Sequence, residues 1–219
     1  MRASLPAAVL FDMDGTLTDT EALWFRAETE ILADLGRQWR PGDEMAVVGL
    51  NLLDACRYLV SHLELSVSAE FLADALTDRV VELGEEHGMP WRPGAFDLLE
   101  RVTALGIPSA LVTASRMSFA RLTLDQAPPG SLEVAITGDQ VTNGKPDPEP
   151  YTKAIERFGV SPGSTLAFED SVYGLASARA AGAVTVGVPL KMDLSGREDV
   201  IIIGSLAEAD EDFLRAVMA

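Results

Sequence analysis

The chain has 219 residues, of which 47% are hydrophobic and 23% are charged, the composition of an ordinary globular protein. With 34 acidic and 17 basic residues its formal net charge is -17, a field that repels nucleic-acid phosphates and anionic membrane surfaces. The single cysteine, Cys56, excludes an internal disulfide and indicates a buried structural role in a reducing compartment. We therefore expect a cytoplasmic protein with no nucleic-acid partner and no membrane partner.

The first predicted element is a buried strand over residues 7–11, followed directly by Asp12, Asp14 and Gly15. In open α/β sheets ligands bind at the carboxyl ends of the strands, so both carboxylates are placed to meet one. Two carboxylates one residue apart suit Mg²⁺ beside a carboxylate nucleophile for phosphoryl transfer. A solvated turn is the structural alternative, because Asp and Gly are also common turn residues.

Between residues 18 and 88 the apolar spacing predicts helices and no strand. Thr20 is predicted to cap a first helix over residues 21–35, a second helix follows Asn51, and a third starts near Ser68. The glycine and proline residues that follow, up to residue 94, break the helical pattern.

Helices and strands then alternate, which predicts a parallel sheet covered on both faces. Helices are predicted over residues 95–105, 118–125, 148–158, 172–181 and 206–217, and strands over 109–113, 133–137, 164–169, 183–188 and 200–203. The first strand must join this sheet, because a lone strand cannot pair its backbone or bury its faces. We predict a doubly wound, Rossmann-like α/β core domain over residues 1–17 and 92–219, with an inserted all-helical cap domain over 18–91 that acts as a lid.

Three further polar groups follow predicted strands and so belong to the same sheet edge as Asp12. Thr113, Ala114 and Ser115 precede a helix, a setting that suits phosphate, with a plain helix cap as the alternative. Lys145 lies in the proline-stiffened segment 144–148, where a lysine can neutralise a nucleophilic carboxylate, with an exposed loop lysine as the alternative.

The third group is Glu169 and Asp170, which end the strand 164–169. Together with Asp12 they offer the oxygen ligands that a divalent cation prefers. Acidic residues that only complement a helix dipole are the alternative.

In this order the motifs resemble the haloacid dehalogenase superfamily of phosphohydrolases, and the resemblance covers nearly the whole chain. The helical insertion and the stretches 144–148 and 168–171 look like its β-phosphoglucomutase-type sugar phosphatase branch. The resemblance implies that Asp12 is the nucleophile that forms an aspartyl phosphate and that Asp14 is the general acid and base.

The resemblance also implies the binding groups. Thr113, Ala114, Ser115 and Lys145 would contact the phosphoryl group. Mg²⁺ would be held by the Asp12 carboxylate, the Asp14 backbone carbonyl and Asp170, with Glu169 at or next to the metal.

The candidates for contact with the rest of the substrate are Trp24, Asn51, Leu52 and Arg116. The mutases of the branch have a histidine where this chain has Trp24, and an arginine for the second phosphate of a bisphosphate where it has Leu52. Without that cation water is the expected phosphoryl acceptor. The structural alternatives are an interior cap position for Trp24 and a surface position for Arg116.

We therefore expect an Mg²⁺-dependent phosphatase that acts on a small phosphorylated metabolite, such as a sugar or polyol phosphate. A phosphomutase that uses the same aspartyl phosphate is the second hypothesis, and a non-catalytic metabolite-binding module is the third. The expected state is a monomer, with a dimer as the alternative.

Overall fold

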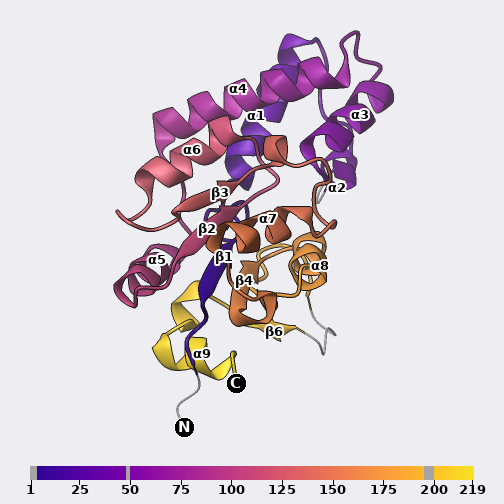
Figure 1. The fold of residues 1–219 in the computed structure, drawn as a ribbon. Coiled ribbons are helices and arrows are strands. Elements are labelled where there is room, and N and C mark those ends of the chain that lie inside the picture. Colours follow the sequence, from indigo (N-terminus) through magenta and orange to yellow (C-terminus); the bar gives the residue numbers. More distant parts are fainter. Residues whose placement is uncertain (1–3, 48–49, 195–199) are drawn as a thin grey trace.

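The centre of the protein is a six-stranded sheet with the order β3-β2-β1-β4-β5-β6 (Figure 1). The computed structural model describes residues 4–47, 50–194 and 200–219. The strands are β1 (Ala8–Phe11), β2 (Ser109–Val112), β3 (Val134–Ile136), β4 (Thr165–Glu169), β5 (Val184–Gly187) and β6 (Ile201–Ile202). All pairs are parallel, and this doubly wound, Rossmann-like order confirms the predicted fold class.

Helices cover the sheet and form the insertion after its first strand. They are α1 (Glu21–Asp34), α2 (Asp43–Val47), α3 (Leu52–His62), α4 (Ala69–His87), α5 (Ala95–Ala104), α6 (Met117–Gln126), α7 (Glu149–Phe158), α8 (Val172–Ala180) and α9 (Glu211–Ala216). In Figure 1 the helices α1 to α4 lie beyond one end of the sheet, where α1 and α3 pack on α4 and α4 packs on α6. The division into a core domain and a cap domain at residues 17 and 92 stays a prediction. No helix within the described ranges is long and apolar enough to cross a membrane.

Strand β1 is buried on both faces, which explains its unbroken apolar sequence. All four of its residues have 0% exposure. Val9 and Phe11 point into the larger core cluster, which continues into the helical insertion, and Leu10 points into a second cluster with Tyr151 and Ala154 of α7. Packing on both faces therefore fixes the place of β1, and with it the place of Asp12, the residue after Phe11.

The register of β1 with its two neighbours brings the polar residues to one edge. Phe11 pairs with Leu111 of β2 and with Phe168 of β4, and the two phenylalanine rings stack with centroids 5.4 Å apart. The backbone N–H of Asp12 donates to the carbonyl of Phe168 over 3.1 Å. The residues that follow these three strands consequently meet at a common edge, as predicted.

Two connections join the insertion to the sheet, and they lie side by side. Thr18 and Trp91 form an antiparallel bridge, and the backbone N–H of Arg92 donates to the carbonyl of Leu17 over 2.8 Å. The Arg92 guanidinium donates to the carbonyls of Gly15 and Val188. The two segments predicted as hinges, near Thr18 and Arg92, are thus hydrogen-bonded to each other.

Two local predictions are wrong in part. Thr20 precedes α1 but makes no side-chain capping bond; its backbone is helical instead of extended, and its hydroxyl donates to Asp14 Oδ1 over 2.5 Å. The predicted helix over 206–217 begins as a 3-10 turn at Leu206–Glu208, and α9 starts only after Asp210, whose side chain caps it. The short helix α2 was not among the predicted elements.

Candidate active site

Asp12 and Lys145 form the centre of the site. The side chains of both residues are 8% exposed, and Lys145 Nζ donates to Asp12 Oδ1 over 2.7 Å. The other carboxylate oxygen, Asp12 Oδ2, is buried and has no hydrogen-bond partner. A buried polar atom without a partner is costly, so this oxygen is available to a ligand or to a reacting atom.

Lys145 is held by three acceptors around its ammonium group. Besides Asp12 it donates to the carbonyl of Val112 over 2.8 Å and to Glu169 Oε1 over 2.6 Å. Burial lowers the pKa of Lys145, but the Asp12 and Glu169 carboxylates outweigh burial and hold this pKa above its ordinary value. Lys145 is therefore positively charged and neutralises the carboxylates beside it.

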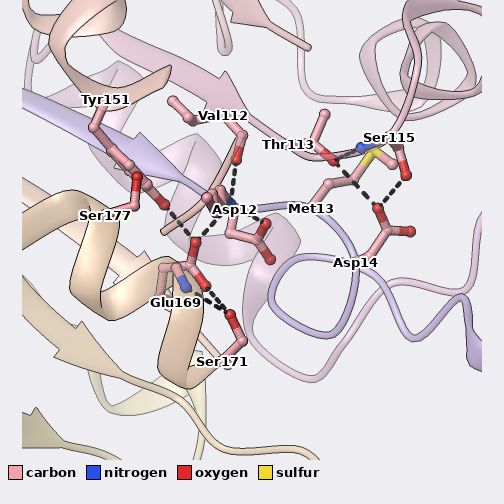
Figure 2. A network of polar contacts seen from close by, with 12 residues as sticks. Asp12, Met13, Asp14, Val112, Thr113, Ser115, Tyr151, Glu169, Ser171 and Ser177 are labelled. Atoms are coloured by element: carbon pink, nitrogen blue, oxygen red, sulfur yellow. Dashed lines mark hydrogen bonds and ion pairs between the residues drawn. The ribbon is translucent and has the colours of Figure 1, made fainter. Parts of the chain in front are cut away.

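Glu169, the last residue of β4, is completely buried, and both of its carboxylate oxygens accept hydrogen bonds. Its Oε1 also accepts a bond of 2.7 Å from the Tyr151 hydroxyl, and its Oε2 accepts one of 3.1 Å from Ser171 (Figure 2). A Cβ added at Gly174 would lie 1.9 to 2.0 Å from the Glu169 carboxyl atoms, so α8 approaches this group as closely as a backbone can.

Asp14 lies on the other side of Asp12, against the loop that follows β2 (Figure 2). Its Oδ2 accepts from the hydroxyls of Thr113 and Ser115 over 3.2 and 2.7 Å. Its Oδ1 accepts from Thr20 and from the Trp24 indole N–H. Burial raises the pKa of Asp14, and its hydrogen bonds only partly oppose this, so Asp14 holds a proton more readily than an exposed aspartate.

Three carboxylates form a group that fits a divalent cation. Oxygen atoms of Asp12, Glu169 and Asp170 lie within 4.8 Å of one another. The fit is supported by the donor set, because carboxylate oxygens are the hard ligands that suit Mg²⁺. Burial and the neighbouring carboxylates raise the pKa of Asp170 to about 8, a shift that a cation would oppose.

Gly15 allows Asp170 to approach the loop after β1. Its φ is +83°, and a Cβ added there would lie 2.2 Å from Asp170 Oδ2. No other residue type combines this backbone conformation with this contact. The glycine of the acidic loop thus serves packing against Asp170 as well as the turn.

The four candidates for substrate contact are not all gathered at the site. Trp24 contacts Asp14, since its indole Nε1 lies 3.4 Å from Oδ1 and its ring packs edge-on against Phe119 of α6. Asn51 instead caps α3, because its side chain accepts from the backbone N–H of Asp54. Leu52 packs on the core cluster, and Arg116 pairs with Asp74 of α4.

The sequence patterns did not predict a role in the site for three residues, Tyr151, Thr20 and Arg92. Tyr151 is part of a regular apolar pattern in α7, so its hydroxyl contact with Glu169 gave no separate signal. Thr20 has the usual appearance of a helix cap. Arg92, predicted only as a hinge position, fastens Gly15 to the end of β5 through its side chain.

Comparison with known proteins yields consistent matches. A family model described as haloacid dehalogenase-like hydrolase matches residues 6–182, a span that includes the whole site. The phosphorylated carbohydrates phosphatase of Thermotoga maritima is 33% identical over 180 residues, covering 80% of this chain and 81% of that protein. Hexitol phosphatase A of Escherichia coli is 30% identical over 196 residues, covering 89% and 88%. The crystal structure of CbbY from Rhodobacter sphaeroides in complex with xylulose 1,5-bisphosphate has a TM-score of 0.83 at 27% identity, covering 93% of this chain and 96% of that one.

Proposed function

Because the chain belongs to the haloacid dehalogenase-like hydrolases and is a phosphomonoesterase of that type, we propose that it hydrolyses a sugar or polyol phosphate with Mg²⁺ and an aspartyl-phosphate intermediate. The observation that carries the proposal is the buried, unpartnered Oδ2 of Asp12 beside the Lys145 ammonium group. The relatives named for phosphorylated carbohydrates and hexitols supply the substrate class. This enzyme is expected to act in the cytoplasm as a monomer.

In the first step Asp12 Oδ2 attacks phosphorus and the bond from phosphorus to the substrate oxygen breaks. Asp14, whose pKa is raised, gives its proton to that departing oxygen and becomes a carboxylate. Lys145 balances the negative charge on the phosphoryl oxygens. The hydroxyls of Thr113 and Ser115, which bond to Asp14 in this structure, would bind the phosphoryl oxygens and so release Asp14 for its role.

In the second step water replaces the sugar at phosphorus. Asp14 accepts a proton from the water, the water oxygen forms a bond to phosphorus, and the bond from phosphorus to Asp12 breaks. Inorganic phosphate and the unmodified Asp12 are the result. Asp12, the Asp14 backbone carbonyl and Asp170 would hold Mg²⁺, with Glu169 beside it, and the cation would neutralise charge on the phosphoryl group.

Water is the proposed acceptor because Leu52 offers no charge to a second phosphate. Leu52 is the first residue of α3 and packs on the hydrophobic core. A phosphomutase must keep its bisphosphate intermediate bound until the second phosphate group reaches the nucleophile. A cationic side chain that binds the other phosphate group serves this purpose. The mutase therefore stays the alternative that the assay must exclude.

The test is phosphate release from a panel of hexose, hexitol, pentulose, nucleotide and glycolate phosphates, with and without Mg²⁺. The variant Asp12→Asn serves as the control because it keeps the shape of the side chain and removes the nucleophile. Release that requires both Mg²⁺ and Asp12 supports the proposal. Interconversion of a hexose phosphate only after a bisphosphate is added, without release of phosphate, would favour the mutase and contradict the phosphatase proposal.

A further inference from the structure

Tyr151 is a buried side chain with a polar hydroxyl group that has no role in the proposed reaction steps. Its residue exposure is 0%, and it lies near the start of α7, six positions after Lys145. Its hydroxyl donates to Glu169 Oε1 over 2.7 Å, and its ring lies under Lys145 Nζ with 5.3 Å between nitrogen and ring centroid. One segment of chain therefore supplies both the ammonium group and a neutral donor beside it.

The hydrogen bonds of Lys145 decide which oxygen of Asp12 stays free. A lysine ammonium group has three hydrogens, and Lys145 has three acceptors: Asp12 Oδ1, the Val112 carbonyl and Glu169 Oε1. None is left for Asp12 Oδ2, which has no partner. The orientation of the proposed nucleophile thus depends on where Glu169 holds the lysine.

Glu169 in turn depends on Tyr151 for its own orientation. Oε1 accepts from Lys145 and Tyr151, and Oε2 accepts from Ser171. Without the tyrosine hydroxyl, Oε1 would be held by the lysine alone. Oε1 would then be less restrained, because Ser171 holds only Oε2, and Lys145 would be less firmly fixed at the place where it meets Asp12 Oδ1.

We propose that Tyr151 is a positioning residue for the phosphoryl-transfer reaction: its hydroxyl fixes Glu169 so that Lys145 bridges Glu169 and Asp12 and leaves Asp12 Oδ2 without a hydrogen bond and free to attack the substrate. This inference rests on the proposed function, because it takes Asp12 as the nucleophile. Tyr151 reaches Asp12 only through Glu169 and Lys145, so we expect its loss to lower the rate of the chemical step more than it weakens substrate binding.

The variant Tyr151→Phe keeps the ring against Lys145 and removes only the hydroxyl. The matched control is Tyr58→Phe, the same change in α3, where Tyr58 stacks on His62 within the helical insertion. With a sugar phosphate that the wild-type protein hydrolyses, we expect kcat of Tyr151→Phe to fall about tenfold, the effect of losing one hydrogen bond to a charged group. We expect KM to stay within about twofold and Tyr58→Phe to match the wild type.

A second readout does not depend on turnover. The chain has three lysines, Lys145, Lys153 and Lys191, so ¹⁵N-lysine labelling gives a side-chain NMR spectrum that is simple to assign by substitution. Lys153 and Lys191 have side-chain exposures of 40% and 65%, against 8% for Lys145. We expect a slowly exchanging ammonium signal from Lys145 that shifts or exchanges faster in Tyr151→Phe and is unchanged in Tyr58→Phe.

The outcomes separate this inference from the proposed function. A lower kcat together with an altered Lys145 signal in a folded Tyr151→Phe variant supports the positioning role. An unchanged kcat and an unchanged Lys145 signal overturn it, even if Asp12→Asn abolishes turnover and so upholds the phosphatase. If the wild-type protein releases no phosphate, the proposed function fails, and an unaltered Lys145 signal in Tyr151→Phe still overturns the positioning role.

Discussion

The indole N–H of Trp24 lies 3.4 Å from Asp14 Oδ1, which links the helical insertion to the proposed general acid. Trp24 also packs edge-on against Phe119 of α6, with ring centroids 5.4 Å apart. Thr20, four residues earlier in the chain, donates to the same oxygen. The start of α1 therefore takes part in the site and does more than cover it.

Replacement of Trp24 by Phe is expected to lower kcat about threefold, because Asp14 loses one donor that fixes its orientation while the packing on Phe119 is largely kept. The matched control is Trp39→Phe, which removes a bond of 3.0 Å from the indole N–H to Thr29 elsewhere in the insertion. Steady-state kinetics on both variants measures the effect. Equal kcat values in the two variants would contradict a role for Trp24 at Asp14.

Replacement of Lys145 by Met is expected to reduce kcat at least about a hundredfold and to lower the free energy of unfolding by about 3–5 kcal/mol. The physical reason is that Asp12 and Glu169 would both remain buried without their cation. Denaturant titration and steady-state kinetics measure the two effects. Lys153→Met, which removes a more exposed partner of Glu149, is the control and is expected to leave both quantities nearly unchanged. Wild-type activity in Lys145→Met would show that Lys145 has no role in the reaction.

Replacement of Gly174 by Ala tests the close approach of α8 to Glu169. The new Cβ would lie 1.9 to 2.0 Å from the Glu169 carboxyl atoms and must displace them. We expect a loss of stability of about 1–3 kcal/mol and a clear loss of activity. In Gly163→Ala the added Cβ meets no atom within 4 Å, so that variant is expected to resemble the wild type. A fully active and stable Gly174→Ala would show that Glu169 can move without consequence.

Cys56 is expected to be unreactive in the folded protein. Burial, together with the charge of Glu28, raises the pKa of its thiol from 9.0 to about 12, so the thiol stays protonated near pH 8. Because the folded pKa is the higher one, its contribution to stability is complete below pH 9.0 and is lost as the pH rises toward about 12. Labelling with a thiol reagent at pH 8 should require denaturant. Rapid labelling of the native protein would contradict this assignment.

Much of the fold follows from local sequence patterns. Strand β1 is an apolar run because both of its faces are buried, and the alternation of helices and strands after residue 95 predicts a parallel sheet. Parallel strands place their carboxyl ends together, so the polar residues after β1, β2 and β4 could be assigned to one edge from their order alone. The start of α9 is harder to predict, because Ser205 and Asp210 are both good caps.

Contacts between distant segments could not be predicted in the same way. The bond between Tyr151 and Glu169 joins α7 to β4, and the ion pair between Arg116 and Asp74 joins the start of α6 to α4. Neither has a fixed spacing in the chain. Thr20 illustrates the opposite difficulty, since its position before α1 predicts a cap, but its backbone is helical instead of extended and its hydroxyl donates to the carboxylate of Asp14.

In the proposed reaction Asp12 becomes phosphorylated during turnover. The most direct measurement is acid quenching of the enzyme during hydrolysis of a ³²P-labelled sugar phosphate, followed by peptide mapping of the protein-bound label. We expect label on the peptide that contains Asp12, and neither label nor turnover in Asp12→Asn. Turnover that proceeds in Asp12→Asn, or label that maps to another residue, would contradict it.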